Sequence, residues 1–357
     1  MVENPKMAQV MILELMYKHQ FNYSLLKELL REKNLDVSFS RVTYGEVAPK
    51  LGSLPTLQGE DIPTFEMFRA RLPNSLFEEI LDDVGIYQLQ YGSPSRHPNE
   101  EARARFLSGY FNRIVAEFSG LMFNTPEAML EGTIATKGHI EYQFKTYRGV
   151  TVVFIEVKLN VGNLTERLNC YAQVIAECDA CAWMNSQNGF YVPIMAVLCD
   201  GQYFYFFKFE DRQETGRRVS RFFLGEFPDG HRRQSIPELD HGDDAVVYLH
   251  QTRLLCESLY YVFLSGYHEG LKGYWNQSVE RRKSALREST PKWHNATVLA
   301  GKALKEATLA WYLRRDDQLE KSKASADKAR EYLVQSVDEV PWKRSRFVAP
   351  EEALDNL

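Results

Sequence analysis

Residues 139–159 read HIEYQFKTYRGVTVVFIEVKL, and this stretch decides the fold. It is rich in β-branched and aromatic residues, which favour strands, and a Tyr-Arg-Gly break interrupts it. Two strand-like runs on either side of such a break indicate a β-hairpin. If Arg148 and Gly149 form a two-residue turn, Tyr147 lies opposite Val150. The sequence therefore predicts two antiparallel strands in a fixed register.

Three polar residues of this hairpin converge in the predicted register. Counting back from the turn places Glu141 opposite Glu156. Side chains alternate along a strand, so Lys158 shares the face of Glu156 while Ile155 and Val157 point into the core. Opposed carboxylates about 5 Å apart repel each other unless a positive charge lies between them, and Mg²⁺ with oxygen ligands supplies one. A metal that polarises a phosphoryl oxygen, beside a lysine that orients or deprotonates water, suits phosphodiester hydrolysis.

The same three residues also suit a purely structural interpretation. Cross-strand pairs of Glu and Lys are ordinary on the solvent-facing side of a half-exposed hairpin. Judged by spacing alone, this interpretation is favoured over a metal site. Both interpretations therefore stay open at this point.

The segments around the hairpin alternate between helix and strand patterns. Apolar residues at helical spacing predict helices over residues 7–32, 99–122, 164–185, 246–264 and 297–334. Apolar runs predict further strands over 192–198 and 203–209, whereas residues 34–61 carry Gly, Pro and Ser without a clear period. This order predicts an α/β fold with a mixed central sheet and flanking helices.

The patterns also suggest a division of the chain into three regions. We expect a helical N-terminal region and linker over residues 1–95, a core over 96–215, and a mainly helical C-terminal region over 216–357.

Composition limits the classes of function. The chain has 357 residues with 44% hydrophobic residues, enough for a folded core, and its net charge of -5 argues against coating nucleic acid by bulk electrostatics. Two arginine-rich segments, 217–233 and 281–287, are more typical of solvated faces. The apolar runs fall short of the roughly 20 residues of a membrane helix, no signal peptide is evident, and five cysteines favour reduced thiols. We expect an intracellular protein without a membrane partner; nuclear and cytoplasmic locations both stay open.

The order of elements over residues ~99–210 resembles the PD-(D/E)XK nuclease superfamily, in particular its fungal nuclease-like members. The likeness consists of a helix, a strand with an acid in GHIEY, a strand ending in FIEVKLN, a helix containing YAQVIAE, and the strand pair AVLCDGQYFYFFKF. The resemblance implies a restriction-endonuclease-like core. It also implies Mg²⁺- or Mn²⁺-dependent cleavage of nucleic acid.

The resemblance assigns roles to residues of this chain. The E-V-K triplet would supply a metal-binding carboxylate from Glu156, a main-chain carbonyl from Val157 and the catalytic lysine, Lys158. The preceding acid, Glu141, would bind the same metal, and Gln173 matches a glutamine that often lies near the lysine.

A glutamate of the first helix commonly reaches the metal through water in this family. Glu117 is the preferred match, and Glu101 is the second choice. One departure concerns Glu141, because the family usually has a proline-preceded aspartate there. The extra methylene displaces the carboxylate by about 1.5 Å, which matters for octahedral Mg²⁺.

These observations predict a metal-dependent nuclease acting on DNA or RNA. The alternative is a catalytically inactive nuclease-like fold that serves as a binding module for nucleic acid or protein, with its function in the helical flanks and arginine-rich segments. The choice between DNA and RNA, the mode of cutting, the pathway and the oligomeric state do not follow from the residues.

Overall fold

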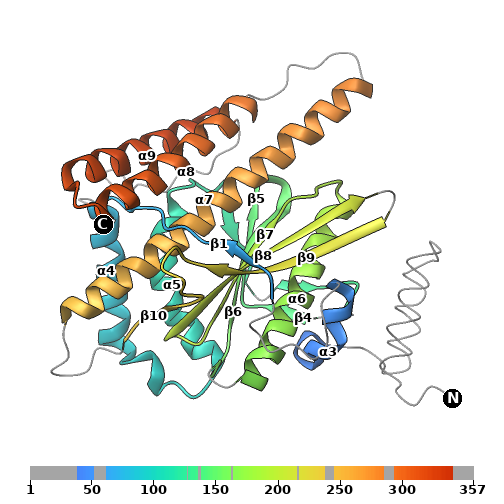
Figure 1. The fold of residues 1–357 in the computed structure, drawn as a ribbon, viewed down its shortest axis with the longest axis horizontal. Coiled ribbons are helices and arrows are strands. Elements are labelled where there is room, and N and C mark those ends of the chain that lie inside the picture. The colour runs from blue at the N-terminus through green and yellow to red at the C-terminus, as the bar shows by residue number, and fades with distance from the viewer. Residues whose placement is uncertain are drawn as a thin grey trace, which may run out of the picture.

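The computed structural model describes residues 38–51, 62–126, 128–135, 138–161, 164–214, 217–237, 245–284 and 293–340. The helix predicted over 7–32 and half of the irregular segment 34–61 lie outside these residues. Within them the fold is α/β as predicted, with a mixed eight-stranded sheet, flanking helices and a helical C-terminal region (Figure 1). Among the described helices, none combines the length and apolar character that crossing a membrane requires.

The central sheet has the strand order β1-β9-β8-β7-β6-β5-β2, and β10 pairs with β8. The pairs β6–β7 and β1–β9 are parallel, and the other pairs are antiparallel. A separate small sheet contains β3 and β4. The strands are β1 Thr64–Glu66, β2 Met122–Asn124, β3 Ala128–Leu130, β4 Gly138–Ile140, β5 Tyr142–Thr146, β6 Val150–Val157, β7 Ile194–Cys199, β8 Tyr203–Glu214, β9 Arg217–Glu226 and β10 Gln234–Ser235.

Helices cover both faces of the sheet. In Figure 1, α4, α5, α7, α8 and α9 gather on one side and α3 and α6 lie on the other, and each side has its own apolar core. The helices are α3 Tyr44–Val47, α4 Asn74–Tyr91, α5 Glu100–Ala116, α6 Leu164–Gln187, α7 Ala245–Ser284, α8 Trp293–Arg315 and α9 Leu319–Glu339. Short 3₁₀ turns are η1 Phe39–Arg41, η2 Ala48–Leu51, η3 Pro94–Arg96 and η4 Tyr147–Gly149.

Three strands of the sheet, β1, β9 and β10, come from outside residues 96–215, the predicted core. Strand β8 is twelve residues long, and β9 pairs with it from Phe207↔Leu224 to Glu214↔Arg217. Strand β1 then adds to the far edge of β9. A long unpaired edge would leave backbone N–H and C=O groups without partners, so the sheet continues until a short strand closes it.

One predicted helix ends earlier than its apolar pattern, and another is divided in two. Helix α5 stops at Ala116 because Ser119 and Gly120 adopt positive φ angles of 47° and 78°. The helix predicted over 297–334 is divided into α8 and α9 near Asp317, whose φ is 57°. A left-handed residue cannot continue a right-handed helix, and the apolar period does not reveal it.

The turn of the central hairpin differs from the predicted two-residue turn. The 3₁₀ turn Tyr147–Gly149 joins the strands, and Thr146 rather than Tyr147 lies opposite Val150. The register next to the turn is therefore shifted by one residue from the prediction.

A β-bulge then restores the predicted register. Lys145 pairs with Thr151 but Phe144 pairs with Val153, which leaves Val152 as the extra residue. From Phe144 to Tyr142 the pairing is the predicted one, and its continuation brings Glu141 beside Glu156. The longer turn and the bulge each shift the register by one residue, in opposite directions. The two carboxylates therefore meet as predicted, although the prediction included neither feature.

Helix α7 approaches the sheet closely through three glycines. A Cβ on Gly266 would lie 2.7 Å from Val153 Cγ2, and one on Gly273 would lie 2.6 Å from Val192 Cγ1. A Cβ on Gly270 would meet Thr146 Cγ2 at 2.9 Å. These distances are below van der Waals contact, so α7 covers β6 at this depth only because these positions lack side chains.

We expect Gly266→Ala to lower the free energy of unfolding by about 1–3 kcal/mol, because the added methyl overlaps a branched side chain in a filled core. Gly85→Ala in α4 is the matched control. It has no atom within 4 Å of the added Cβ, and it should raise stability by up to about 1 kcal/mol through helix propensity. Urea unfolding of both variants measures the difference, and equal effects would contradict the proposed close approach.

Candidate active site

The candidate site lies where β6 ends and faces helix α6. Glu156 is the seventh residue of β6, and its side chain is 1% exposed. Lys158 follows the strand, held by a main-chain hydrogen bond from its N to the carbonyl O of Cys199 at 2.8 Å. The ammonium of Lys158 lies 2.6 Å from Glu156 Oε1, so strand alternation places both side chains on one face.

Glu141 reaches the same place from the bend that precedes β5. Its Oε2 accepts a hydrogen bond from the main-chain N of Val157 at 3.3 Å. The carboxyls of Glu141 and Glu156 also contact each other, and this contact contributes to the raised pKa of Glu156. The structure therefore brings Glu141, Glu156, Val157 and Lys158 together.

Helix α6 contributes two polar side chains to this cluster. Gln173 is buried and donates through Nε2 to Glu156 Oε1, and the same nitrogen donates to Glu177 Oε1 at 2.8 Å. Glu177 is completely buried. Sequence reasoning missed Glu177, although it lies four residues after Gln173 in YAQVIAE and four residues make one helical turn. That spacing was the available signal.

The first helix contributes Glu100, not the predicted Glu117. Glu100 Oε2 lies 3.6 Å from Lys158 Nζ, at the N-terminus of α5. Arg103, one turn on, fixes this end by donating to the carbonyl O of Asp200 at 3.1 Å.

Glu117 lies past the opposite end of α5, and with a rise of about 1.5 Å per residue it is roughly 25 Å from Glu100. Both of its carboxylate oxygens accept hydrogen bonds from Arg330 of α9, at 2.7 and 2.9 Å. The structure therefore does not bring Glu117 to the cluster of Glu156 and Lys158. The second choice, Glu101, pairs with Arg105 on the surface.

The electrostatics of the cluster follow from crowding acids in a buried place. Burial, the charge of Glu177 and the contact with Glu141 raise the pKa of Glu156 well above its usual value. Burial also raises the pKa of Glu177 to about 8, although the hydrogen bond from Gln173 lowers it. Burial lowers the pKa of Lys158, but attraction to Glu156 outweighs this effect and raises it above its usual value. Lys158 is therefore an ammonium at neutral pH.

The cluster has the oxygen chemistry that a hard cation requires. Oε2 of Glu156 and Oε2 of Glu177 are buried without a hydrogen-bond partner, so each has an unused acceptor. Across the described ranges, no group of three or more His, Cys, Asp or Glu side chains has a metal-holding arrangement. The donor set implied by the resemblance is smaller, since it uses the carboxylates of Glu141 and Glu156 and one main-chain carbonyl. Those residues fit Mg²⁺ or Mn²⁺ in donor type and charge.

Neither the models of known protein families nor the curated proteins match this chain. Among solved structures, it is similar to a chain of the cryo-EM structure of a DrdV–DNA complex, with 10% sequence identity and a TM-score of 0.25. The likeness covers 79% of this chain and 27% of that chain, so this chain spans less than a third of the other's length. Membership of the PD-(D/E)XK superfamily accordingly stays a prediction from residues ~99–210.

The raised pKa of Glu177 predicts how stability depends on pH without metal. Between its ordinary value of 4.5 and about 8, the folded protein holds a proton that the unfolded chain has lost. The free energy of unfolding should therefore fall as pH rises through this window. The Glu177→Gln side chain is neutral at every pH, so the free energy of unfolding of this variant should fall less over the same window.

Urea unfolding with a chelator, from about pH 3 to about pH 9, tests this expectation and covers the acid range of the control. Glu306→Gln is a control of opposite sign, because hydrogen bonds from Ser325 and Lys328 lower the pKa of Glu306. Replacing this carboxylate should lower the free energy of unfolding above pH 4.5, the ordinary pKa of the group, and should have no such effect in acid. Equal slopes for the wild type and Glu177→Gln would refute the proton assignment.

Proposed function

We propose that this chain is a metal-dependent nuclease that hydrolyses phosphodiester bonds in nucleic acid. The observation that carries the proposal is the Glu156 carboxylate. It is buried at the end of the central strand beside the carboxyl of Glu141, bound by Lys158 and Gln173 through one oxygen, and its other oxygen accepts no hydrogen bond.

Stability does not account for this arrangement. Burying an ion pair costs desolvation energy that its attraction rarely exceeds, and apolar side chains of similar size usually serve a core as well or better. Here the cost is larger, because two further carboxyls, Glu141 and Glu177, raise the pKa of Glu156. Clustered groups with perturbed pKa values are typical of functional sites.

The residues divide the work of hydrolysis. Glu141, Glu156 and the main-chain carbonyl of Val157 would hold Mg²⁺ or Mn²⁺. When bound, the ion supplies polarisation of a phosphoryl oxygen and acidification of water. Lys158 keeps its proton, so it donates hydrogen bonds to the substrate and offsets developing negative charge instead of acting as a base. Gln173 orients Glu156 by donating to it.

The alternative is a nuclease-like fold that binds nucleic acid or protein without cutting it. In that case the arginine-rich segment 217–233 would be a natural contact surface. The structure buries one of its arginines, since Arg218 pairs with Asp179 at 2.9 Å and Asp211 at 2.8 Å, and it pairs Arg232 with Glu226 on the surface at 2.9 Å. These pairs favour the catalytic proposal over the binding module.

Lys158→Ala should reduce metal-dependent cleavage by roughly a hundredfold or more while the protein stays folded, because a transition-state contact is lost. Lys208→Ala is the matched control: Lys208 and Glu210 form another lysine–glutamate pair two residues apart on a strand of the same sheet, at 2.5 Å. It should cleave as the wild type does. The assay measures cleavage of labelled single- and double-stranded DNA and RNA in the presence of Mg²⁺ or Mn²⁺.

Metal binding itself gives a second readout. Mg²⁺ or Mn²⁺ should raise the Tm of the wild type because the native state binds the ion, and Glu156→Gln should abolish the shift. If the wild type cleaves none of the substrates and neither ion changes its Tm, the nuclease proposal fails and the binding module replaces it.

A further inference from the structure

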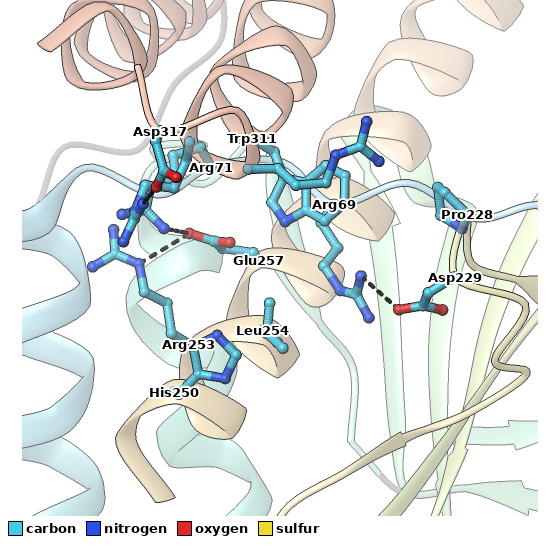
Figure 2. Close-up of a pocket in the computed structure, with 12 residues that line it drawn as sticks. Arg69, Arg71, Pro228, Asp229, His250, Arg253, Leu254, Glu257, Trp311 and Asp317 are labelled. Atoms are coloured by element: carbon cyan, nitrogen blue, oxygen red, sulfur yellow. Dashed lines mark hydrogen bonds and ion pairs between the residues drawn. The ribbon is translucent and has the colours of Figure 1, made fainter. Parts of the chain in front are cut away.

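A cavity lined by charged side chains lies on the other side of the sheet, between the segment after β1, the turn after β9, helix α7 and the end of α8 (Figure 2). Its volume is about 640 Å³. None of its lining residues belongs to the Glu156 cluster. Five arginines line it: Arg69, Arg71, Arg253, Arg314 and Arg315.

The arginines outnumber the acids of the cavity. Three carboxylates line it, from Asp229, Glu257 and Asp317, and Asp316 pairs with Arg315 at 3.7 Å from outside the lining, which leaves one positive charge in excess. Figure 2 shows Glu257 between two guanidinium groups, and its Oε1 accepts from Arg71 at 2.8 Å and from Arg253 at 3.0 Å. The Glu257 carboxylate thus pairs with two guanidinium groups. Like charges held together without enough counter-charge indicate a place for an anion.

Arg69 shows that the positive charge is built into the wall. Its side chain is 5% exposed and its guanidinium lies 4.1 Å from the ring centre of Phe227. Nη2 donates to Gln234 at 3.0 Å, and Asp229 lies 3.7 Å from Nη1, but Nε is buried with no hydrogen-bond partner. The fold thus holds the charge of Arg69 in the wall of the cavity, where it would attract an anion.

We propose that this cavity binds a phosphate monoester of nucleotide size. Guanidinium groups are planar forks that bind phosphate oxygens in pairs, and several of them converge here from three segments. The volume is in the range of small-ligand sites, and Leu254 and Trp311 give the cavity an apolar wall for the rest of the ligand. The monoester is either a free nucleotide or the phosphorylated end of a nucleic acid.

The first experiment is calorimetry with AMP, inorganic phosphate and adenosine, in the presence of a chelator so that no cleavage occurs. AMP and phosphate should bind, and adenosine should not. The double variant Arg314→Gln/Arg315→Gln should weaken AMP binding by roughly tenfold or more, because charged hydrogen bonds are lost. Both side chains are more than two-fifths exposed, so the fold should tolerate the change.

Lys272→Gln is the matched control. Its side chain is 45% exposed and it pairs with an acid three residues away, as Arg314 at 43% does, but it lies outside the cavity. It should bind AMP as the wild type does. Arg69→Met removes the unpartnered donor and should also weaken AMP binding.

A second arm separates the two sources of the phosphate. DNA hexamers with a 5′-phosphate and with a 5′-hydroxyl are compared with AMP under the same conditions. Tighter binding of the phosphorylated hexamer than of AMP assigns the site to a nucleic-acid end, and equal or weaker binding assigns it to a free nucleotide. The proposal is overturned if adenosine binds as tightly as AMP, or if both arginine variants bind AMP as the wild type does. Neither result bears on the Lys158 assay, because no residue is shared.

Discussion

Strand β6 is buried along its whole length, and this burial is the constraint on which the rest of the structure depends. A strand covered on both faces must satisfy every polar side chain within the protein. Two such side chains occur, Thr151 and Glu156. The Thr151 hydroxyl accepts a hydrogen bond from Gln143 Nε2 of β5 at 2.8 Å, and α6 supplies contacts at both residues. Asn185 bonds both main-chain groups of Thr151, at 2.9 and 2.7 Å, and Gln173 bonds Glu156. These bonds fix helix α6 to β6 near both ends of the strand, and they stabilise the bulge beside Thr151.

The same constraint creates the chemistry of the cluster. Once α6 is fixed over the end of β6, Glu177 lies beside Glu156, and the bend before β5 brings Glu141 to them. Repulsion among these carboxyls contributes to the raised pKa values of Glu156 and Glu177. A bound proton or cation would relieve that repulsion. A protein selected for stability alone would remove such a conflict, whereas sites that bind and react commonly retain one.

Helix α7 links the two polar sites of the molecule without belonging to the first. Its glycines allow it to lie directly on β6 and Val192, across the sheet from the Glu156 cluster. Earlier in the same helix, Arg253 and Glu257 form one wall of the arginine cavity, and the main-chain N of Arg71 reaches the carbonyl O of Ala307 in α8 at 2.8 Å. One close helix–sheet contact thus supports the apolar core and the cavity together.

The sequence by itself determined what depends on local period: the β-rich hairpin, the shared face of Glu156 and Lys158, helix α6 and the α/β class. Alternation along a strand and the turn of a helix repeat over a few residues, so they are visible in 139–159 and in YAQVIAE. The tertiary structure decided the rest, because it depends on contacts between distant segments. It replaced Glu117 with Glu100, added Glu177, offset a longer turn with a bulge, and assembled the arginine cavity from four separate segments. Helix ends and helix rotation are set by the surfaces that they contact, and no local pattern records them.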